Sequence, residues 1–153
     1  MTMKDRVEKA VELFKSGYNC SQSVVAAFAD MYGFTQEQAL RMSASFGGGI
    51  GRMRQTCGAA CGMFLLAVLE KGAVDGKDRE GKAANYALVQ QLAEEFRKRN
   101  GSMICAELLG LKKPEGSSTP EARTEQYYAK RPCAKMVEEA AAIWAEYLEK
   151  QRK

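Results

Sequence analysis

Histidine is absent from the 153 residues of this chain. Its absence excludes Cys–His dyads, Ser–His–Asp triads, zinc sites that use imidazole and histidine-ligated haem. Long apolar runs are lacking too, since none approaches the roughly 20 residues of a membrane-spanning helix. The N-terminal residues are charged throughout and lack the apolar core of a secretory signal. We therefore expect a cytoplasmic protein that is not inserted in a membrane.

Proline is scarce, with only three in the chain, whereas Ala, Glu, Lys, Leu and Met are frequent, which favours helix. The chain is 46% hydrophobic and 27% charged, as is ordinary for a soluble globular protein. The formal net charge is only +4, and Lys and Arg are interspersed with Glu instead of forming the basic patch that nucleic-acid binding requires. We expect no nucleic-acid partner, and a single domain over residues 1–153.

Apolar residues recur at helical spacing between capping residues, and no stretch has a convincing strand pattern. This pattern predicts an all-α, single-domain bundle of about six to seven helices. The segment from Met63 to Leu69 is apolar nearly all round, which predicts a fully buried helix. The candidate helical segments, of which 120–130 is an optional short one, are residues 3–16, 20–32, 36–45, 57–71, 77–99, 103–109, 120–130 and 132–151.

Four of the five cysteines, Cys20, Cys57, Cys105 and Cys133, fall in the first turn of an expected helix. A helix start presents unsatisfied N–H groups and the positive end of the helix dipole, and both lower the pKa of a thiol. In a reducing compartment such cysteines serve redox chemistry or metal binding more often than a static disulfide framework. Cys61 lies one turn deeper on an apolar helix, so we expect it to fill the core or to act as a resolving thiol for Cys57.

The four helix starts would form one thiol-rich pocket if the bundle brings them together, and three interpretations then remain open. In the first, the pocket carries thiol–disulfide chemistry with an unknown redox partner or small thiol, one of Cys20 or Cys57 being the attacking thiolate. In the second, the same four cysteines, with Cys105 and Cys133, are metal ligands around zinc or an iron–sulfur cluster. In the third, they are small buried apolar residues of a helical interaction module. Four cysteines allow three pairings, and the sequence does not select one.

A glycine-rich run, Gly47, Gly48, Gly49 and Gly51, precedes Cys57. It matches neither a P-loop nor a dinucleotide fingerprint, because no Gly-Lys-Ser/Thr follows and no strand precedes it. Glycines permit close backbone approach, so we expect a tight crossing of backbones beside the thiols. If a cofactor or small ligand binds there, these four glycines, Arg52 and Gly58 are the candidates to contact it. Arg52 and Arg54 could stabilise a thiolate or an anionic substrate, although an exposed loop position is the expectation for either one alone.

Three features together resemble the C_GCAxxG_C_C family, whose members are described as redox-active: the Gly-Tyr-Asn-Cys-Ser-Gln context of Cys20, the Gly-Gly-Gly-Ile-Gly-Arg-Met stretch, and the Cys-Gly-Ala-Ala-Cys-Gly run followed by two single cysteines. The resemblance covers roughly Val7 to Trp144. It places the four signature cysteines on Cys20, Cys57, Cys105 and Cys133, and Cys61 at a variable position. It implies a redox or metal role for the four and sometimes a functional link to a transporter, without a reaction or a substrate. A homodimer is expected only as the general prior for soluble proteins.

Overall fold

The structure is a computed structural model that describes residues 1–111 and 117–152. Over these residues the chain forms eight α-helices, two short 3₁₀ helices and no strand, so the all-α prediction is confirmed. The elements are α1 (Met3–Lys15), α2 (Cys20–Ala26), η1 (Ala29–Tyr32), α3 (Gln36–Ser43), η2 (Ala44–Phe46), α4 (Gly58–Lys71), α5 (Arg79–Asn100), α6 (Cys105–Leu108), α7 (Glu125–Lys130) and α8 (Cys133–Gln151).

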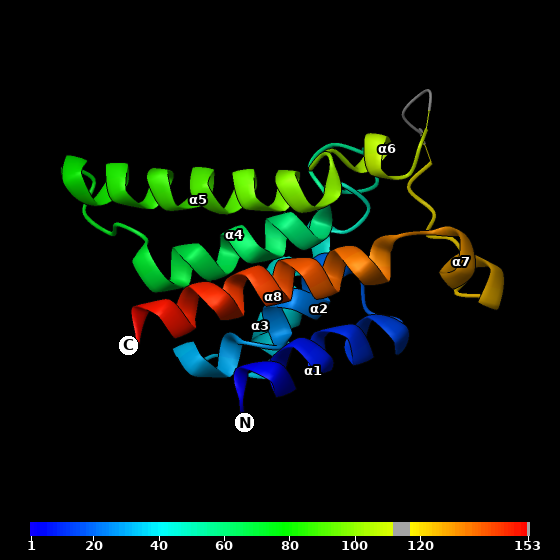
Figure 1. Cartoon of the computed structure of the whole chain (residues 1–153), viewed down its shortest axis with the longest axis horizontal. Coiled ribbons are helices and arrows are strands. Elements are labelled where there is room, and N and C mark those ends of the chain that lie inside the picture. Colours follow the sequence, from blue (N-terminus) through cyan, green and yellow to red (C-terminus); the bar gives the residue numbers. More distant parts are fainter. Residues whose placement is uncertain (112–116, 153) are drawn as a thin grey trace.

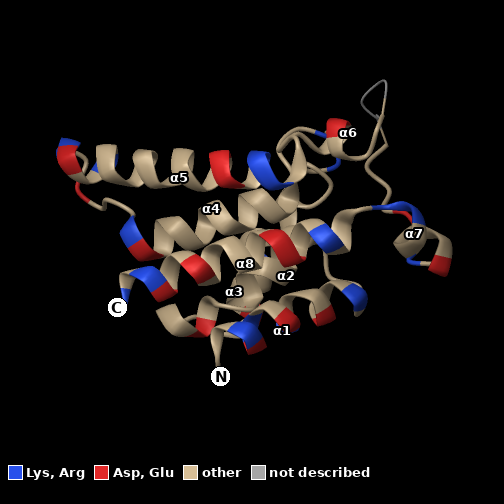
Figure 2. Ribbon diagram, viewed as in Figure 1, with Lys and Arg blue, Asp and Glu red and all other residues tan. Residues whose placement is uncertain are grey.

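The long helices form a bundle around α4 and α8 (Figure 1). Helix α8 packs along α1 and also contacts α2, α4 and α5, while α4 packs against α2 and α5 as well. Fully buried aromatic side chains, Phe14, Phe28, Phe96 and Trp144, fill the space between them. The short helices α6 and α7 lie at one end of this bundle, away from the C-terminus. The polar surface carries charges of both signs, interspersed along α1, α5 and α8 (Figure 2).

Helix α4 is buried less completely than its sequence predicts. Its first six residues, Gly58 to Met63, are all buried. Beyond them the helix turns one side outward, so that Val68 is 48% exposed. The expectation of full burial therefore holds only for the half of α4 that lies beside the cysteines. No helix in the described ranges is long and apolar enough to cross a membrane.

Two predicted helices begin or end elsewhere for identifiable reasons. The expected helix over residues 20–32 ends at Ala26, and Arg6 of α1 donates a hydrogen bond of 3.0 Å to the freed carbonyl of Ala27. The expected helix over residues 120–130 begins only at Glu125, capped by Thr124. Before that cap, the side chains of Glu121 and Arg123 bind residues from other segments of the chain. Tertiary contacts thus override the local helical pattern at both points.

Candidate functional site

The four signature cysteines stand at four helix starts. Cys20, Cys105 and Cys133 are the first residues of α2, α6 and α8, and Cys57 is the N-cap of α4 instead of lying in its first turn. All four line one cavity of about 60 Å³. Cys20, Cys57 and Cys105 are buried, whereas Cys133 is half-buried and is therefore the most accessible of the four. The structure thus brings together the four cysteines that the sequence singles out.

Cys61 is not among the residues that line this cavity. It is buried, and its Sγ lies 3.7 Å from the carbonyl oxygen of Thr56, so its thiol donates back toward the start of its own helix. Burial raises the pKa of Cys61 to about 11. This position agrees with the expectation that Cys61 fills the core.

Backbone hydrogen bonds fix two of the cysteines relative to each other. The Cys57 N–H donates to the Met103 carbonyl at 2.7 Å, and the Cys105 N–H donates to the Gln55 carbonyl at 2.6 Å. Together with an isolated antiparallel bridge between Thr56 and Ile104, they clamp the end of the glycine-rich loop to the residues before α6. The start of α4 and the start of α6 are therefore held as one unit.

The glycine-rich loop crosses this unit at close range, as the sequence predicts. A Cβ on Gly49 would lie 2.5 Å from the Cβ of Cys105 and 2.8 Å from the Cα of Arg54. A Cβ on Gly58 would lie 2.8 Å from the Phe46 carbonyl oxygen and 3.3 Å from the Cβ of Cys20. The two glycines thus permit the backbone to pass directly beside two of the cysteines.

The same loop turns with left-handed backbone geometry, even at residues other than glycine. Ile50, Arg52 and Arg54 have φ values of 66°, 62° and 60°. Each such residue costs on the order of 1–2 kcal/mol relative to a right-handed conformation. Strain of this kind persists only where surrounding contacts enforce it, and it clusters at functional sites. Here it fixes the direction of the two arginine side chains.

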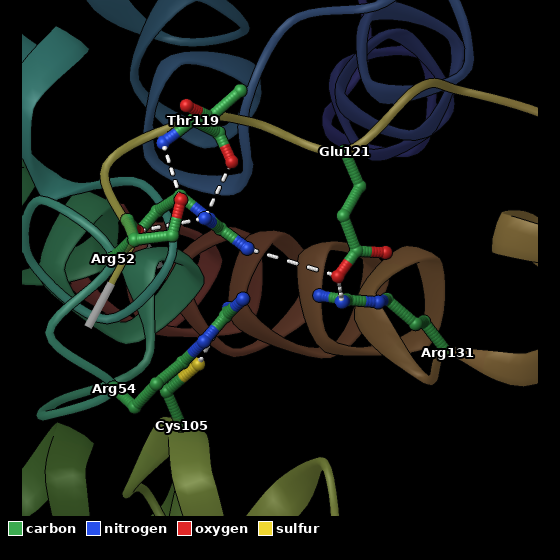
Figure 3. Close-up of polar contacts among 7 residues, drawn as sticks. Arg52, Arg54, Cys105, Thr119, Glu121 and Arg131 are labelled. Atoms are coloured by element: carbon green, nitrogen blue, oxygen red, sulfur yellow. Dashed lines mark hydrogen bonds and ion pairs between the residues drawn. The ribbon is translucent and has the colours of Figure 1, made fainter. Parts of the chain in front are cut away.

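Arg54 is buried, only 3% exposed, and lines the thiol cavity. Its Nη1 lies 3.7 Å from Cys105 Sγ, as Figure 3 shows. The expectation of an exposed loop arginine is therefore wrong for this residue, because the left-handed turn directs the side chain inward. Arg52 is half-buried, with 14% of its side chain exposed, and donates a hydrogen bond of 2.7 Å to the Ser117 carbonyl.

Two further arginines line the cavity, Arg123 and Arg131, and the sequence analysis missed both. Arg123 donates to the carbonyls of Phe14 and Tyr18 at 2.8 and 2.9 Å. Arg131 forms an ion pair with Glu121. Arg131 lies two residues before a signature cysteine, and this proximity is the signal that could have indicated it. No signature cysteine lies equally close to Arg123 in the sequence, so nothing local indicates that this residue lines the cavity.

Cys20 and Cys133 shift the pKa of each other in this cavity, and hydrogen bonding between the two thiols is the largest cause of both shifts. This bond lowers the pKa of Cys133 despite its burial, and the positive charges of Arg131, Arg54 and Arg123 lower it further. The same bond, together with burial, raises the pKa of Cys20. Cys133 is therefore the thiolate of the pair, and the Cys20 S–H is the donor.

The sequence-based expectation of a lowered pKa at Cys20 or Cys57 is thus wrong. The helix start does act on Cys57, because the nearby backbone N–H groups of Ala60 and Ala59 favour the thiolate and lower the pKa of this thiol. Burial outweighs them and raises the pKa of Cys57 to about 12. Burial also raises the pKa of Cys105, although Arg54 opposes it.

The metal interpretation receives no geometric support. Within the part of the chain that the structure describes, no three or more Cys, Asp or Glu side chains are grouped so that they could hold a metal ion. Thiols are suitable ligands for zinc or iron, and metal binding by the four cysteines stays a prediction.

A second, wider cleft of about 350 Å³ opens beside the thiol cavity. Gly47, Gly48, Gly51 and Arg52 line this cleft, while Gly48, Gly49 and Gly58 line the cavity itself. Each of the six residues suggested for contact with a ligand therefore lines the cleft, the thiol cavity or both. Binding at these positions remains a prediction.

The amino-acid sequence was also compared with known protein families, curated proteins and solved structures. Residues 18–147 match the family described as "Putative redox-active protein (C_GCAxxG_C_C)". No curated protein and no solved structure matches the chain significantly. Because the family match spans most of the sequence, the chain belongs to the C_GCAxxG_C_C family.

Proposed function

We propose that this protein performs dithiol–disulfide chemistry, with Cys133 as the attacking thiolate and Cys20 as the resolving thiol. The observation that carries the proposal is that Cys20 and Cys133 stand at two helix starts on the wall of one cavity, where each is the largest influence on the pKa of the other. Two cysteines on the wall of one cavity of about 60 Å³ need little movement to join, and the more accessible one also has the lower pKa. Family membership supports redox activity in general.

The reaction follows from the roles of the two sulfurs. The Cys133 thiolate attacks one sulfur of a disulfide substrate, the substrate S–S bond breaks, and one substrate thiolate leaves. Cys20 then gives up its proton and attacks the Cys133 sulfur. This second step forms the Cys20–Cys133 disulfide and releases the other substrate thiolate. The protein loses two electrons and the substrate disulfide gains them.

Cys57 and Cys105 line the same cavity, with raised pKa values. We infer that they are not the first thiols to react. They could receive the oxidation from Cys20–Cys133 by exchange, or they could shape the cavity. In either role, neither Cys57 nor Cys105 makes the first attack on the substrate, which is made by Cys133.

A trapping series tests this assignment. Reduced protein is mixed with hydroxyethyl disulfide, and the reaction is quenched with acid. The mass of the intact protein is then measured by mass spectrometry. We expect wild type to form an internal disulfide, Cys20→Ser to stop as a mixed disulfide on Cys133, and Cys133→Ser to remain unmodified. Cys61→Ser is the matched control and should behave as wild type. A mixed disulfide that accumulates on Cys57 or Cys105 in Cys20→Ser would refute the assignment.

A further inference from the structure

The four thiols of the cavity are held in place in two different ways. Backbone hydrogen bonds join the start of α4 to the residues before α6, and so fix Cys57 relative to Cys105. Among the described residues, no backbone hydrogen bond joins the segment before Cys20 to the segment before Cys133. Helices α2 and α8 do pack against each other, but the two cysteines are their first residues, and helix ends fray unless the chain before them is held.

The side chain of Arg123 bridges these two segments. Toward α1 and the turn after it, Nη1 donates to the Phe14 carbonyl at 2.8 Å and Nη2 donates to the Tyr18 carbonyl at 2.9 Å. Toward α7, the guanidinium carbon lies over the Tyr127 ring, 5.0 Å from its centre, and Nη1 donates to the Tyr128 hydroxyl at 3.2 Å. A planar guanidinium can donate hydrogen bonds at its edge while its face stacks on an aromatic ring. Arg123 therefore binds the end of α1 and α7 at the same time.

Each of these contacts is close in sequence to one thiol of the reacting pair. The Tyr18 carbonyl is two residues before Cys20. Helix α7 ends three residues before Cys133, and the Arg131 N–H donates back to the Tyr127 carbonyl at 3.1 Å. In the part of the chain that the structure describes, none of the extensive contacts between helices involves α7. Side chains therefore carry much of the attachment of α7 to the bundle.

Tyr128 completes the connection between α7 and α1. Its hydroxyl accepts the hydrogen bond from Arg123 and donates one of 3.2 Å to the Lys15 carbonyl. Its ring meets the Phe14 ring edge-on, with 5.9 Å between their centres. We call Arg123 and Tyr128 together the clamp.

We propose that Arg123 is a positioning residue, which holds the starts of α2 and α8 together so that Cys20 can resolve the mixed disulfide on Cys133. The inference rests on the proposed function, because it assigns a residue to the second step of the same reaction. In that step Cys20 gives up its proton, its sulfur bonds to the Cys133 sulfur, and the substrate half leaves as its thiolate. Such an internal attack depends on geometry, and a misplacement of about 1 Å can slow a positioned reaction by about 100-fold. The first step joins two separate molecules and does not need Cys20 in place.

Separate measurement of the two steps tests this role. Hydroxyethyl disulfide is the substrate, and both rates are followed by rapid acid quench and intact mass, well above the Cys133 pKa of about 7. The first rate, mixed-disulfide formation, is measured in the Cys20→Ser background, where the product is trapped. The second rate, conversion of the mixed disulfide to the internal disulfide, is measured with Cys20 present. We expect Arg123→Gln to slow the second step by at least about tenfold and to leave the first nearly unchanged.

Three further substitutions separate the clamp from the charge and from the fold. Arg123→Lys keeps the positive charge but loses the planar set of donors, so it should slow the second step about as much as Arg123→Gln. Tyr128→Phe removes only a hydroxyl and should slow that step by about threefold. Arg79→Gln is the matched control, since it removes an arginine from the exposed start of α5, at the far end of the molecule from α7 (Figure 1), and should match wild type. Circular dichroism shows whether each variant is folded, and Tyr128→Phe decides the question if the Arg123 variants are not.

The outcomes separate this inference from the function on which it rests. An unchanged second step in Arg123→Gln, or in Tyr128→Phe where the Arg123 variants do not fold, would overturn the clamp and leave the thiol chemistry intact. Recovery of the wild-type rate in Arg123→Lys would also overturn it, because charge alone would then be sufficient. Equal slowing of both steps would do the same, since the site would then be disturbed as a whole. Failure of wild type to form either disulfide would refute the proposed function and this inference with it.

Discussion

Substitution of Gly49 by alanine should disturb the site while leaving every cysteine and arginine in place. Gly49 has a φ of +74°, in the left-handed region, and its Cα faces Cys105. An added Cβ would lie 2.5 Å from the Cβ of Cys105 and 2.8 Å from the Cα of Arg54 and the Gln55 nitrogen. These are main-chain atoms or the first side-chain carbon, so no side-chain rotation relieves the clash.

Two contributions set the expected size of the effect. Alanine in a left-handed conformation costs about 1 kcal/mol relative to glycine. Overpacking of a tight contact adds typically about 1–3 kcal/mol, so Gly49→Ala should lower the free energy of unfolding by about 2–4 kcal/mol. Gly51→Ala is the matched control, because Gly51 also has a positive φ, +59°, but an added Cβ there meets nothing within 4 Å. Only the conformational cost of about 1 kcal/mol then remains.

Urea denaturation followed by far-ultraviolet circular dichroism measures both free energies. If Gly49→Ala and Gly51→Ala destabilise the protein equally, the loop does not pack against Cys105 as described. A larger loss in Gly49→Ala should be accompanied by faster alkylation of Cys105, because its backbone must move away from the loop. Unchanged protection of Cys105 despite the stability loss would contradict the claim that the loop positions this thiol.

Further predictions concern the acidity of the thiols. The pKa of Cys133 is lowered to about 7, so its alkylation by iodoacetamide should be fast above pH 7 and should slow as the pH falls through that value. Cys20→Ala removes the S–H donor, and the midpoint of this profile should rise by about one unit; a midpoint that does not move would show that the hydrogen bond is not the cause. The pKa of Cys57 is raised to about 12, so Cys57 should remain unmodified while Cys133 reacts, as peptide mapping of partly alkylated protein can show. Early modification of Cys57 would mean that its helix start outweighs burial after all.

The sequence predicts the helices well because the signals for them are local. The cap at Asn19 and the capping box that begins at Thr35 both form as the sequence indicates. The placement of cysteines at helix starts is also local information, and the four cysteines that it singles out line one cavity. The predicted helix boundaries deviate from the structure where distant segments compete with the local pattern, as when Arg6 binds the carbonyl of Ala27.

The electrostatics of the site could not be predicted in the same way. A helix start favours a thiolate, but the sequence does not show how deeply each thiol is buried. At Cys57 burial outweighs the backbone donors, whereas at Cys133 a neighbouring thiol and three arginines outweigh burial. The inward direction of Arg54 depends on a left-handed turn of non-glycine residues, for which the sequence carries no reliable signal.

Disulfide mapping of the oxidised protein is the most direct test of the central claim. Protein purified without oxygen, and assayed for iron, zinc and acid-labile sulfide, is oxidised with one equivalent of a small disulfide and digested. The account predicts a metal-free, colourless protein whose first internal disulfide joins Cys20 to Cys133. A first disulfide between any other two cysteines, or a stoichiometric metal bound by the four thiols, would contradict it.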